Sequence, residues 1–222
     1  MEPNGTFLPL TGIPVYYFVC RTCGFCFAPK FSTWSQEDFK RNIYNDEYAI
    51  VDPGYIESRP RDNAENMKAM FPEFSPNLRH LDYGGGEGLL SSILKRYAWN
   101  SESYDPIIDN SSDALPKLGK FDLITAFEVF EHVSDLDRLM TDLNLSLIDD
   151  GIILFSTLLS DGNIDGDRIT WWYASPRNGH ISLFSKQSLT ILANKYKFMF
   201  GSFSPGFHIL ARTIPAWAKH IL

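Results

Sequence analysis

The chain has 222 residues, of which 44% are hydrophobic and 21% are charged, and its formal net charge is -7. This composition is typical of a globular protein and excludes wholesale disorder. The acidic balance argues against a nucleic-acid partner, because such a surface needs a concentrated basic face. The longest apolar runs, 13–20 and 152–159, are too short to cross a bilayer, so we expect no membrane span.

The first 30 residues contain a strand-like aromatic run at 15–19 and all three cysteines. The start of the sequence lacks the basic residues of a secretory signal, which favours a cytoplasmic location. Cys20, Cys23 and Cys26 are odd in number and closely spaced. They therefore do not form a disulfide framework, and they indicate metal chemistry or a remnant of it.

Residues 33–75 are expected to be helical. Ser35 is placed to cap a helix that begins at Gln36, and a second helical stretch near 64–70 stops before Pro72. From residue 77 onward, strands and helices alternate. Strands are expected at 78–83, 121–127, 152–155, 198–203 and 207–211, and a weaker strand is expected to end at 103–105. Helices are expected at 89–97, from 136 until Gly151 ends the helix, and near 186–196. This order predicts an α/β fold with a mostly parallel sheet and an antiparallel pair at its end.

A glycine-rich turn, Gly84 to Gly88, lies between the strand at 78–83 and the helix at 89–97. Glycines at the end of a parallel strand let the backbone approach a ligand without a Cβ in the way. A dinucleotide-binding loop needs glycine at its first, third and sixth positions, but Leu89 occupies the sixth. The turn also lacks the Gly-Lys-Ser/Thr ending of a Walker loop. A nicotinamide-dependent oxidoreductase is therefore disfavoured.

The pattern Asp-x-Gly-x-Gly-x-Gly at 82–88 resembles motif I of class I S-adenosylmethionine-dependent methyltransferases. The resemblance extends to Asp105 after the second strand, to the Glu-x-x-Glu-His segment at 128–132, and to the strand entered through Gly151. Together these segments cover about 78–212. The resemblance implies a Rossmann-like class I sheet, mostly parallel with an antiparallel terminal strand. It divides the chain into a cysteine-containing segment and helical cap (1–75), a cofactor-binding domain (76–212) and a short amphipathic tail (213–222).

The resemblance also implies which residues contact the cofactor, S-adenosyl-L-methionine, whose product is S-adenosyl-L-homocysteine. In such proteins the acidic residue at the place of Asp105 holds both ribose hydroxyls, and Arg59 is a candidate for the cofactor carboxylate. Glu131 is expected to be a solvated or capping residue. The full set of expected cofactor contacts is Asp82, Tyr83, Gly84, Gly86, Asp105, Glu128, Val129 and Arg59.

Two features depart from the family pattern. The stretch 106–120 is too short for a complete third strand and helix, so we expect both to be reduced to a loop, with Asp113 as the candidate adenine contact. The Cys20-Arg-Thr-Cys23 segment is similar to the second knuckle of a zinc-binding module found before some sugar methyltransferases. A zinc site needs four ligands, and no Cys or His precedes Cys20. We therefore expect a remnant without zinc, and no metal site elsewhere.

His180 and His132 are the candidate catalytic residues, because histidine is the usual base near neutral pH. His180 precedes a Phe-Ser pair and a helix, as a histidine does in many small-molecule methyltransferases, and the alternative is a packed or capping residue. His80 and His220 are expected to be structural or solvated. The aromatic run 171–173 either walls a substrate pocket or packs a lid onto the sheet.

These patterns predict an enzyme that transfers a methyl group from S-adenosylmethionine to an oxygen, nitrogen or carbon of a small-molecule acceptor. The alternative is a non-catalytic or regulatory protein that binds the cofactor and retains the fold. A homodimer formed through the aromatic-rich cap or the tail is a further possibility at the level of composition.

Overall fold

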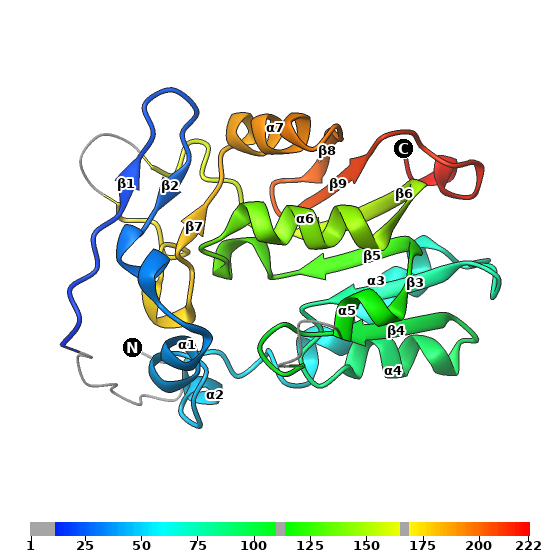
Figure 1. Cartoon of the computed structure of the whole chain (residues 1–222), viewed down its shortest axis with the longest axis horizontal. Helices are drawn as coiled ribbons and strands as arrows, with labels where there is room; N and C mark the ends of the chain where they lie inside the picture. The colour runs from blue at the N-terminus through cyan, green and yellow to red at the C-terminus, as the bar shows by residue number, and fades with distance from the viewer. Residues whose placement is uncertain (1–11, 110–113, 165–168) are drawn as a thin grey trace.

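The computed structural model describes residues 12–109, 114–164 and 169–222 (Figure 1). The helices are α1 (Gln36–Asn42), α2 (Tyr48–Val51), α3 (Ser58–Met70), α4 (Leu89–Arg96), α5 (Ala114–Leu118), α6 (Leu136–Ser146) and α7 (Lys186–Lys195). The strands are β1 (Phe18–Val19), β2 (Cys26–Phe27), β3 (Arg79–Tyr83), β4 (Asn100–Tyr104), β5 (Phe121–Phe127), β6 (Leu147–Ser156), β7 (Ser182–Leu183), β8 (Met199–Ser204) and β9 (Phe207–Ala211). Short 3₁₀ helices lie at Pro29–Thr33, Phe130–His132, Pro176–Asn178 and Ala216–Ile221.

Six strands form the main sheet in the order β4-β3-β5-β6-β9-β8. The pairs β3–β4, β3–β5 and β5–β6 are parallel, whereas β9 runs antiparallel to both β6 and β8. This arrangement confirms the predicted α/β fold with an antiparallel end. It also places the carboxyl ends of β3, β4, β5 and β6 at one edge of the sheet, where ligands bind in open α/β folds.

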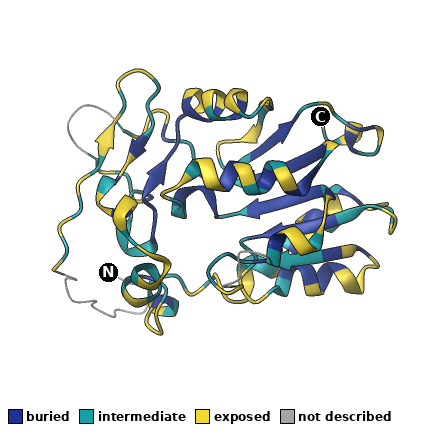
Figure 2. Cartoon of the chain, in the orientation of Figure 1, coloured by how far each residue is buried: buried dark blue, intermediate teal, exposed yellow. Residues whose placement is uncertain are grey.

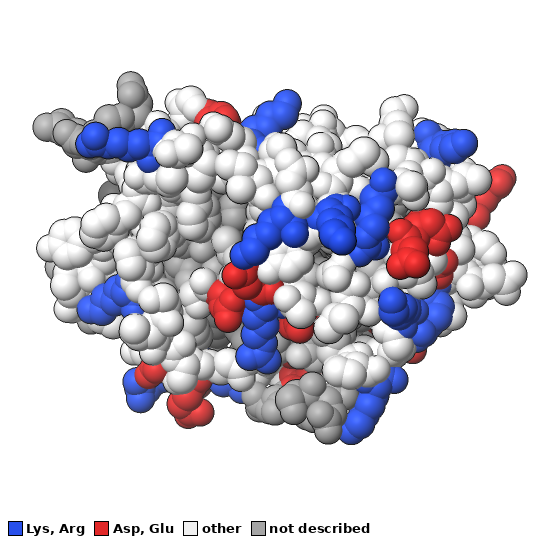
Figure 3. Space-filling model, turned by 45° about the horizontal axis from the view of Figure 1, so that its top comes forward, with Lys and Arg blue, Asp and Glu red and all other residues white. Residues whose placement is uncertain are grey.

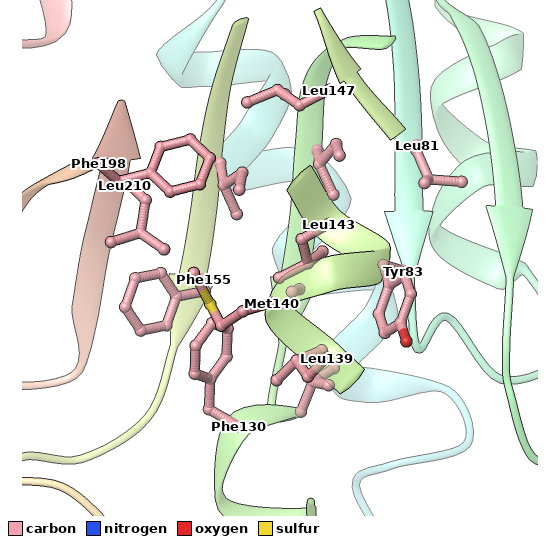
Figure 4. Packing of buried hydrophobic residues seen from close by; sticks show 14 of the residues in the cluster. Leu81, Tyr83, Phe130, Leu139, Met140, Leu143, Leu147, Phe155, Phe198 and Leu210 are labelled. Carbon is pink, nitrogen blue, oxygen red and sulfur yellow. The ribbon is translucent and has the colours of Figure 1, made fainter. Parts of the chain in front are cut away.

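Helices cover both faces of this sheet, and the strands between them are largely buried (Figure 2). On one face, α5, α6 and α7 pack against side chains such as Ile124 and Phe155, and Figure 4 shows Met140 and Leu143 of α6 against this face. On the other face, α3 and α4 pack against Leu123. Successive strand residues alternate between the two cores because the side-chain period of a strand is two.

The helical cap begins as the sequence predicts. Ser35 Oγ accepts a hydrogen bond from the Asp38 amide over 3.2 Å, and the Ser35 amide donates to Asp38 Oδ2 over 3.0 Å. This reciprocal capping box fixes the start of α1. The second predicted helix is α3, which starts earlier than expected and carries Arg59 in its first turn.

A second, smaller sheet links the beginning of the chain to a segment late in the sequence. Its strand order is β1-β2-β7, and both pairings are antiparallel. Cys26 pairs with Leu183, and Phe27 pairs with Ser182. The cysteine-containing segment therefore lies beside the residues that follow His180 (Figure 1).

Two local expectations are wrong. Gly151 does not end a helix: α6 stops at Ser146 and Gly151 lies inside β6, where a Cβ would come 2.9 Å from the Asp122 carbonyl oxygen. The second concerns 106–120, where the helix α5 survives because Leu115 is buried against the core. Between β4 and β5 the described residues form no strand, as predicted. Asp113 lies outside the described residues.

The tail folds back onto α3 as the 3₁₀ helix Ala216–Ile221. The Trp217 ring lies 5.7 Å from both Phe71 and Phe74, measured between ring centroids. His220 Nε2 also bonds the Met70 carbonyl oxygen over 2.8 Å. In the part of the chain that the structure describes, no helix is long and apolar enough to cross a membrane.

Candidate functional site

The glycine loop between β3 and α4 forms one wall of the candidate site. Gly84 and Gly86 have φ values of +74° and +54°, a backbone region that favours glycine. A Cβ on Gly84 would lie 2.5 Å from Val129 Cγ2, so the loop packs directly against the segment after β5. A Cβ on Gly86 would meet nothing within 4 Å, so the loop is open on that side.

Asp82, at the end of β3, lies directly beneath this loop. Its side chain is buried, and Oδ1 accepts a hydrogen bond from Thr125 Oγ1 over 2.9 Å. A Cβ on Gly85 would overlap its carboxyl group. Burial raises the pKa of Asp82 to about 7, and the charge of Asp105 adds to the effect. Asp82 therefore supports the loop from below.

A buried polar chain extends from Asp82 into the sheet. His80 Nε2 lies 3.0 Å from Thr125 Oγ1, and His80 Nδ1 lies 2.7 Å from Ser101 Oγ. Because Thr125 donates its hydroxyl hydrogen to Asp82, His80 Nε2 must be the donor to Thr125. Burial lowers the pKa of His80 to about 3, so the imidazole is neutral. His80 is thus a structural residue, as expected.

Asp105, at the end of β4, ties two loops together. Its Oδ2 accepts a hydrogen bond from the Gly86 amide over 3.0 Å. Its Oδ1 accepts bonds from the Ile107 amide at 2.8 Å and the Ile108 amide at 3.2 Å. The carboxylate therefore stands beside the open side of the glycine loop, where the sequence predicts the ribose contact.

Glu128 and Arg59 meet at the end of β5. Glu128 adopts a φ of +54°, and its Oε1 accepts a hydrogen bond from Ser156 Oγ over 2.8 Å. Arg59 Nη1 lies 3.6 Å from Glu128 Oε2, and the same guanidinium bonds Asp52. The structure thus brings Arg59 from the helical cap to the edge that carries the glycine loop.

The side chain of Tyr83 points away from the glycine loop. Its hydroxyl donates to Asp142 Oδ2 of α6 over 3.0 Å, and Figure 4 shows its ring beside that helix. Any contact from Tyr83 to a ligand at the loop would therefore come from its backbone.

Next to Glu128, the 3₁₀ helix Phe130–His132 brings together residues from distant parts of the chain. Glu131 is fully buried, and its Oε1 accepts a hydrogen bond from the Tyr173 hydroxyl. The His132 and His180 rings lie 4.9 Å apart between centroids. His180 Nδ1 donates to the Tyr173 carbonyl oxygen over 2.7 Å, and His132 Nδ1 lies 3.0 Å from the Tyr44 hydroxyl.

The expectation that Glu131 is solvated or capping is therefore wrong, because the turn after β5 carries it inward. Burial, with the nearby Glu128 carboxylate, raises the pKa of Glu131 to about 8. Burial also lowers the pKa values of His132 and His180 below the usual range of histidine. Of the aromatic run, Tyr173 packs against this group whereas Trp172 is 73% exposed.

The cysteines do not form a single group. Cys20 and Cys23 lie in the turn between β1 and β2, where the Gly24 amide donates to the Cys20 carbonyl oxygen over 2.8 Å. Cys26 is fully buried in β2, and burial raises the pKa of its thiol to about 11. Cys26 therefore faces the core with Tyr173 and Leu183, away from that turn.

The charged side chains on the face shown in Figure 3 are of both signs and lie next to one another. Near the site, the acidic groups outnumber the basic ones. Four carboxyl side chains border the glycine loop and the turn after β5, namely Asp82, Asp105, Glu128 and Glu131, whereas Arg59 brings one positive charge to them.

The sequence does not predict that Glu131 lies beside Tyr173 and His180. Its partners Tyr173 and His180 lie far along the chain, so no local spacing shows the contact. The one available signal was the Glu-x-x-Glu-His spacing, which places Glu128 and Glu131 one turn apart.

This chain has the features that define the class I methyltransferase fold. They are a mostly parallel α/β sheet, a glycine loop after its first strand and an acidic residue after the next strand. The model of the methyltransferase domain family matches residues 55–199. The chain therefore belongs to the methyltransferase domain family.

Solved structures agree on the fold. An O-methyltransferase family protein from Burkholderia thailandensis is 13% identical, with a TM-score of 0.56 over 83% of this chain and 64% of that chain. The CMeT domain of citrinin polyketide synthase is also 13% identical, with a TM-score of 0.51 over 80% of this chain and 60% of that chain. The chain thus spans less than two-thirds of the length of either. A search of curated proteins finds no significant match.

Proposed function

We propose that this chain transfers a methyl group from S-adenosylmethionine to an oxygen, nitrogen or carbon atom of a small-molecule acceptor. The observation that carries this proposal is the open glycine loop held by a carboxylate: the Gly86 amide donates to Asp105 Oδ2, and space remains above Gly86. A carboxylate beside an open backbone loop suits a ribose diol, because it accepts directional, charge-assisted hydrogen bonds.

The charge of the site supports the same ligand. When bound, S-adenosylmethionine supplies an electrophilic methyl group on a positively charged sulfonium, together with an ammonium and a carboxylate. Glu128 supplies negative charge near the positive end, Asp82 adds to it when ionised, and Arg59 is the positive side chain that can bind the carboxylate. Val129 packs against Gly84 and so fixes the distance between the glycine loop and the segment after β5.

His132 and His180 lie next to this set, beyond Glu128 along the chain and in space. We assign them to the acceptor side of the site. Their rings can orient an acceptor and hold or receive its proton, which is the part of methyl transfer that the protein must perform.

Calorimetry with S-adenosylmethionine, S-adenosylhomocysteine and NAD tests the cofactor proposal. The two methionine-derived ligands are expected to bind and NAD is not. Asp105→Asn keeps one side-chain oxygen that can accept from the backbone amides but replaces the other oxygen with an NH₂ donor. It is therefore expected to weaken binding of both methionine-derived ligands by about tenfold or more. The proposal fails if the folded wild type binds neither methionine-derived ligand.

The alternative is a non-catalytic protein that binds the same cofactor. It is favoured by the absence of a strand between β4 and β5 in the described residues, since that region usually contributes to the adenine pocket. Methyl transfer from labelled cofactor to a panel of hydroxylated, amino and activated-methylene acceptors separates the two. Turnover with any acceptor rejects the non-catalytic alternative.

A further inference from the structure

We propose that Glu131, His132 and His180 form a binding site for a divalent transition-metal ion on the acceptor side of the methyltransferase site. One candidate ligand atom from each side chain lies within 4.8 Å of the others. Among the described residues, no other group of three or more His, Cys, Asp or Glu side chains meets this criterion. The inference replaces our sequence-based expectation that the chain has no metal site.

An unpartnered oxygen provides the second observation. Glu131 is fully buried; Oε1 accepts the Tyr173 hydroxyl, whereas Oε2 has no hydrogen-bond partner. A buried carboxyl oxygen without a hydrogen-bond partner costs free energy, and in native proteins such an atom calls for an explanation, of which a bound ion is one. A cation between Glu131 and the two imidazoles would satisfy this oxygen.

The imidazoles are already oriented for coordination. In His180, Nδ1 donates to the Tyr173 carbonyl, which leaves the Nε2 lone pair free to coordinate. In His132, Nδ1 contacts the Tyr44 hydroxyl, so Nε2 is the second candidate nitrogen. Metal-binding histidines almost always bond a carbonyl or another acceptor through their second nitrogen, because that contact fixes the tautomer and the ring.

The three candidate ligand atoms would have to move only a short distance to bind an ion. Metal–ligand bonds of about 2.1 Å place ligands roughly 3–4 Å apart. Side chains whose ligand atoms lie within 4.8 Å therefore need to close by at most about 1–2 Å to hold an ion. Rotation about the side-chain bonds can provide a shift of this size.

The donor set selects the kind of ion. Two imidazoles and one carboxylate suit first-row transition metals such as Zn²⁺, Mn²⁺ or Fe²⁺, whereas Mg²⁺ and Ca²⁺ prefer oxygen ligands. Three protein ligands also leave coordination positions for water or an acceptor oxygen. The carboxylate of Glu128 is near enough to act electrostatically on both Glu131 and His180, and so adds negative charge that favours a cation.

The site can be tested without measuring methyl transfer. The 222-residue chain is stripped with a chelator and titrated with Zn²⁺, Mn²⁺ and Mg²⁺ by calorimetry. The titrations use the Cys20→Ser/Cys23→Ser background, which removes thiolates that would bind Zn²⁺ elsewhere. We expect one Zn²⁺ or Mn²⁺ per chain with a Kd in the micromolar range or tighter, and weaker binding of Mg²⁺.

Matched variants identify the ligands. Glu131→Gln and His180→Gln should each weaken Zn²⁺ binding at least tenfold, whereas His220→Ala removes an imidazole outside the site and should leave the affinity unchanged. Circular dichroism and thermal unfolding of each chelated variant show whether it is folded. If a ligand variant is unfolded, histidine-proton NMR of the Cys20→Ser/Cys23→Ser protein gives the same answer, because bound Zn²⁺ should shift the His132 and His180 resonances.

The proposal is overturned if the folded, chelator-stripped protein binds neither Zn²⁺ nor Mn²⁺, or if binding survives unchanged in folded Glu131→Gln and His180→Gln. The separate titration with S-adenosylhomocysteine distinguishes the two proposals. A chain that binds this ligand but no metal retains the proposed function and loses this inference. A chain that binds metal at these residues but does not bind S-adenosylhomocysteine retains this inference and loses the proposed function.

Discussion

Thr125 donates its hydroxyl hydrogen to Asp82 across the first and third strands of the parallel sheet, β3 and β5, and both side chains are buried. The pair lies directly beneath the glycine loop, so the protonation state of Asp82 is linked to the stability of the loop and the fold.

Asp82 should make stability depend on pH. Its pKa in the folded state, about 7, is raised from 3.8, so between about pH 4 and 7 the folded protein holds a proton that the unfolded chain has released. The free energy of unfolding that Asp82 contributes is therefore present at low pH and lost as the pH rises toward 7, by at most about 1.4 kcal/mol per pH unit.

Urea unfolding of the ligand-free wild type and of Asp82→Asn, measured from pH 4 to 7, checks this prediction. The stability of the wild type relative to Asp82→Asn should fall across that range. The difference between the two proteins isolates Asp82 from other groups such as His80. A difference that stays constant with pH would contradict the assignment.

Gly84 and Gly86 should respond differently to the same substitution. Gly84→Ala combines positive φ with a Cβ 2.5 Å from Val129 Cγ2, so it should lower the free energy of unfolding by about 1–3 kcal/mol. Gly86→Ala meets open space and should cost only the conformational strain of roughly 1 kcal/mol, while still weakening cofactor binding.

A double-mutant cycle with Val129→Ala provides the control. Removing the Val129 methyl groups should recover part of the loss in Gly84→Ala but none of the loss in Gly86→Ala. Strict additivity at Gly84 would mean that the contact with Val129 does not limit that position.

Arg59 should matter only for ligands with an amino-acid end. Arg59→Met keeps the aliphatic stem but removes the guanidinium that reaches Glu128. Loss of a charge-assisted hydrogen bond should weaken S-adenosylhomocysteine binding by about tenfold or more. Binding of methylthioadenosine, which has no carboxylate, should be unchanged. Calorimetry with both ligands measures this, and equal losses for the two would place Arg59 outside the carboxylate contact.

Trp217 should stabilise the fold without affecting the site. Its ring packs on Phe71 and Phe74 beside α3, near the start of β3 and so away from the glycine loop. Trp217→Ala should lower the free energy of unfolding by about 1–3 kcal/mol and leave the affinity for S-adenosylhomocysteine unchanged. Denaturant unfolding and calorimetry on the same preparation check both parts. A large change in affinity would show that the tail communicates with the site.

Features encoded over a few residues could be predicted from the sequence. The Ser35 cap and the glycine loop each depend on neighbours along the chain, and the structure has both. The prediction at Gly151 was wrong because glycine also marks helix ends. Here glycine is required because the Leu147 side chain and the Asp122 carbonyl leave no room for a Cβ inside the sheet. That crowding exists only once the strands have paired.

The acceptor side could be predicted only in part, for the same reason. The two candidate histidines were found from their local motifs, but their proximity to each other and to Glu131 depends on how the segment after β6 folds back. The sequence alone also does not show whether a glutamate is buried or solvated. The burial of Glu131 follows from the turn after β5 and from Tyr173, which approaches it from a distant loop.

The small β1-β2-β7 sheet has a consequence for how such a protein can diversify. The segment around His180 is supported by residues that precede the recognisable methyltransferase segment at 55–199. Tyr17 donates to the His180 carbonyl over 2.5 Å, the Ala28 amide donates to Ile181 over 2.9 Å, and Tyr48 donates to Asn178 over 3.2 Å.

A fragment that begins at residue 55 would thus keep the glycine loop and Asp105 but lose the hydrogen bonds that support the segment around His180. Changes confined to the first 54 residues can move the segment around His180 while leaving the loop itself intact. Under the proposed function, substitutions in the amino-terminal segment would alter acceptor preference independently of the glycine loop and Asp105.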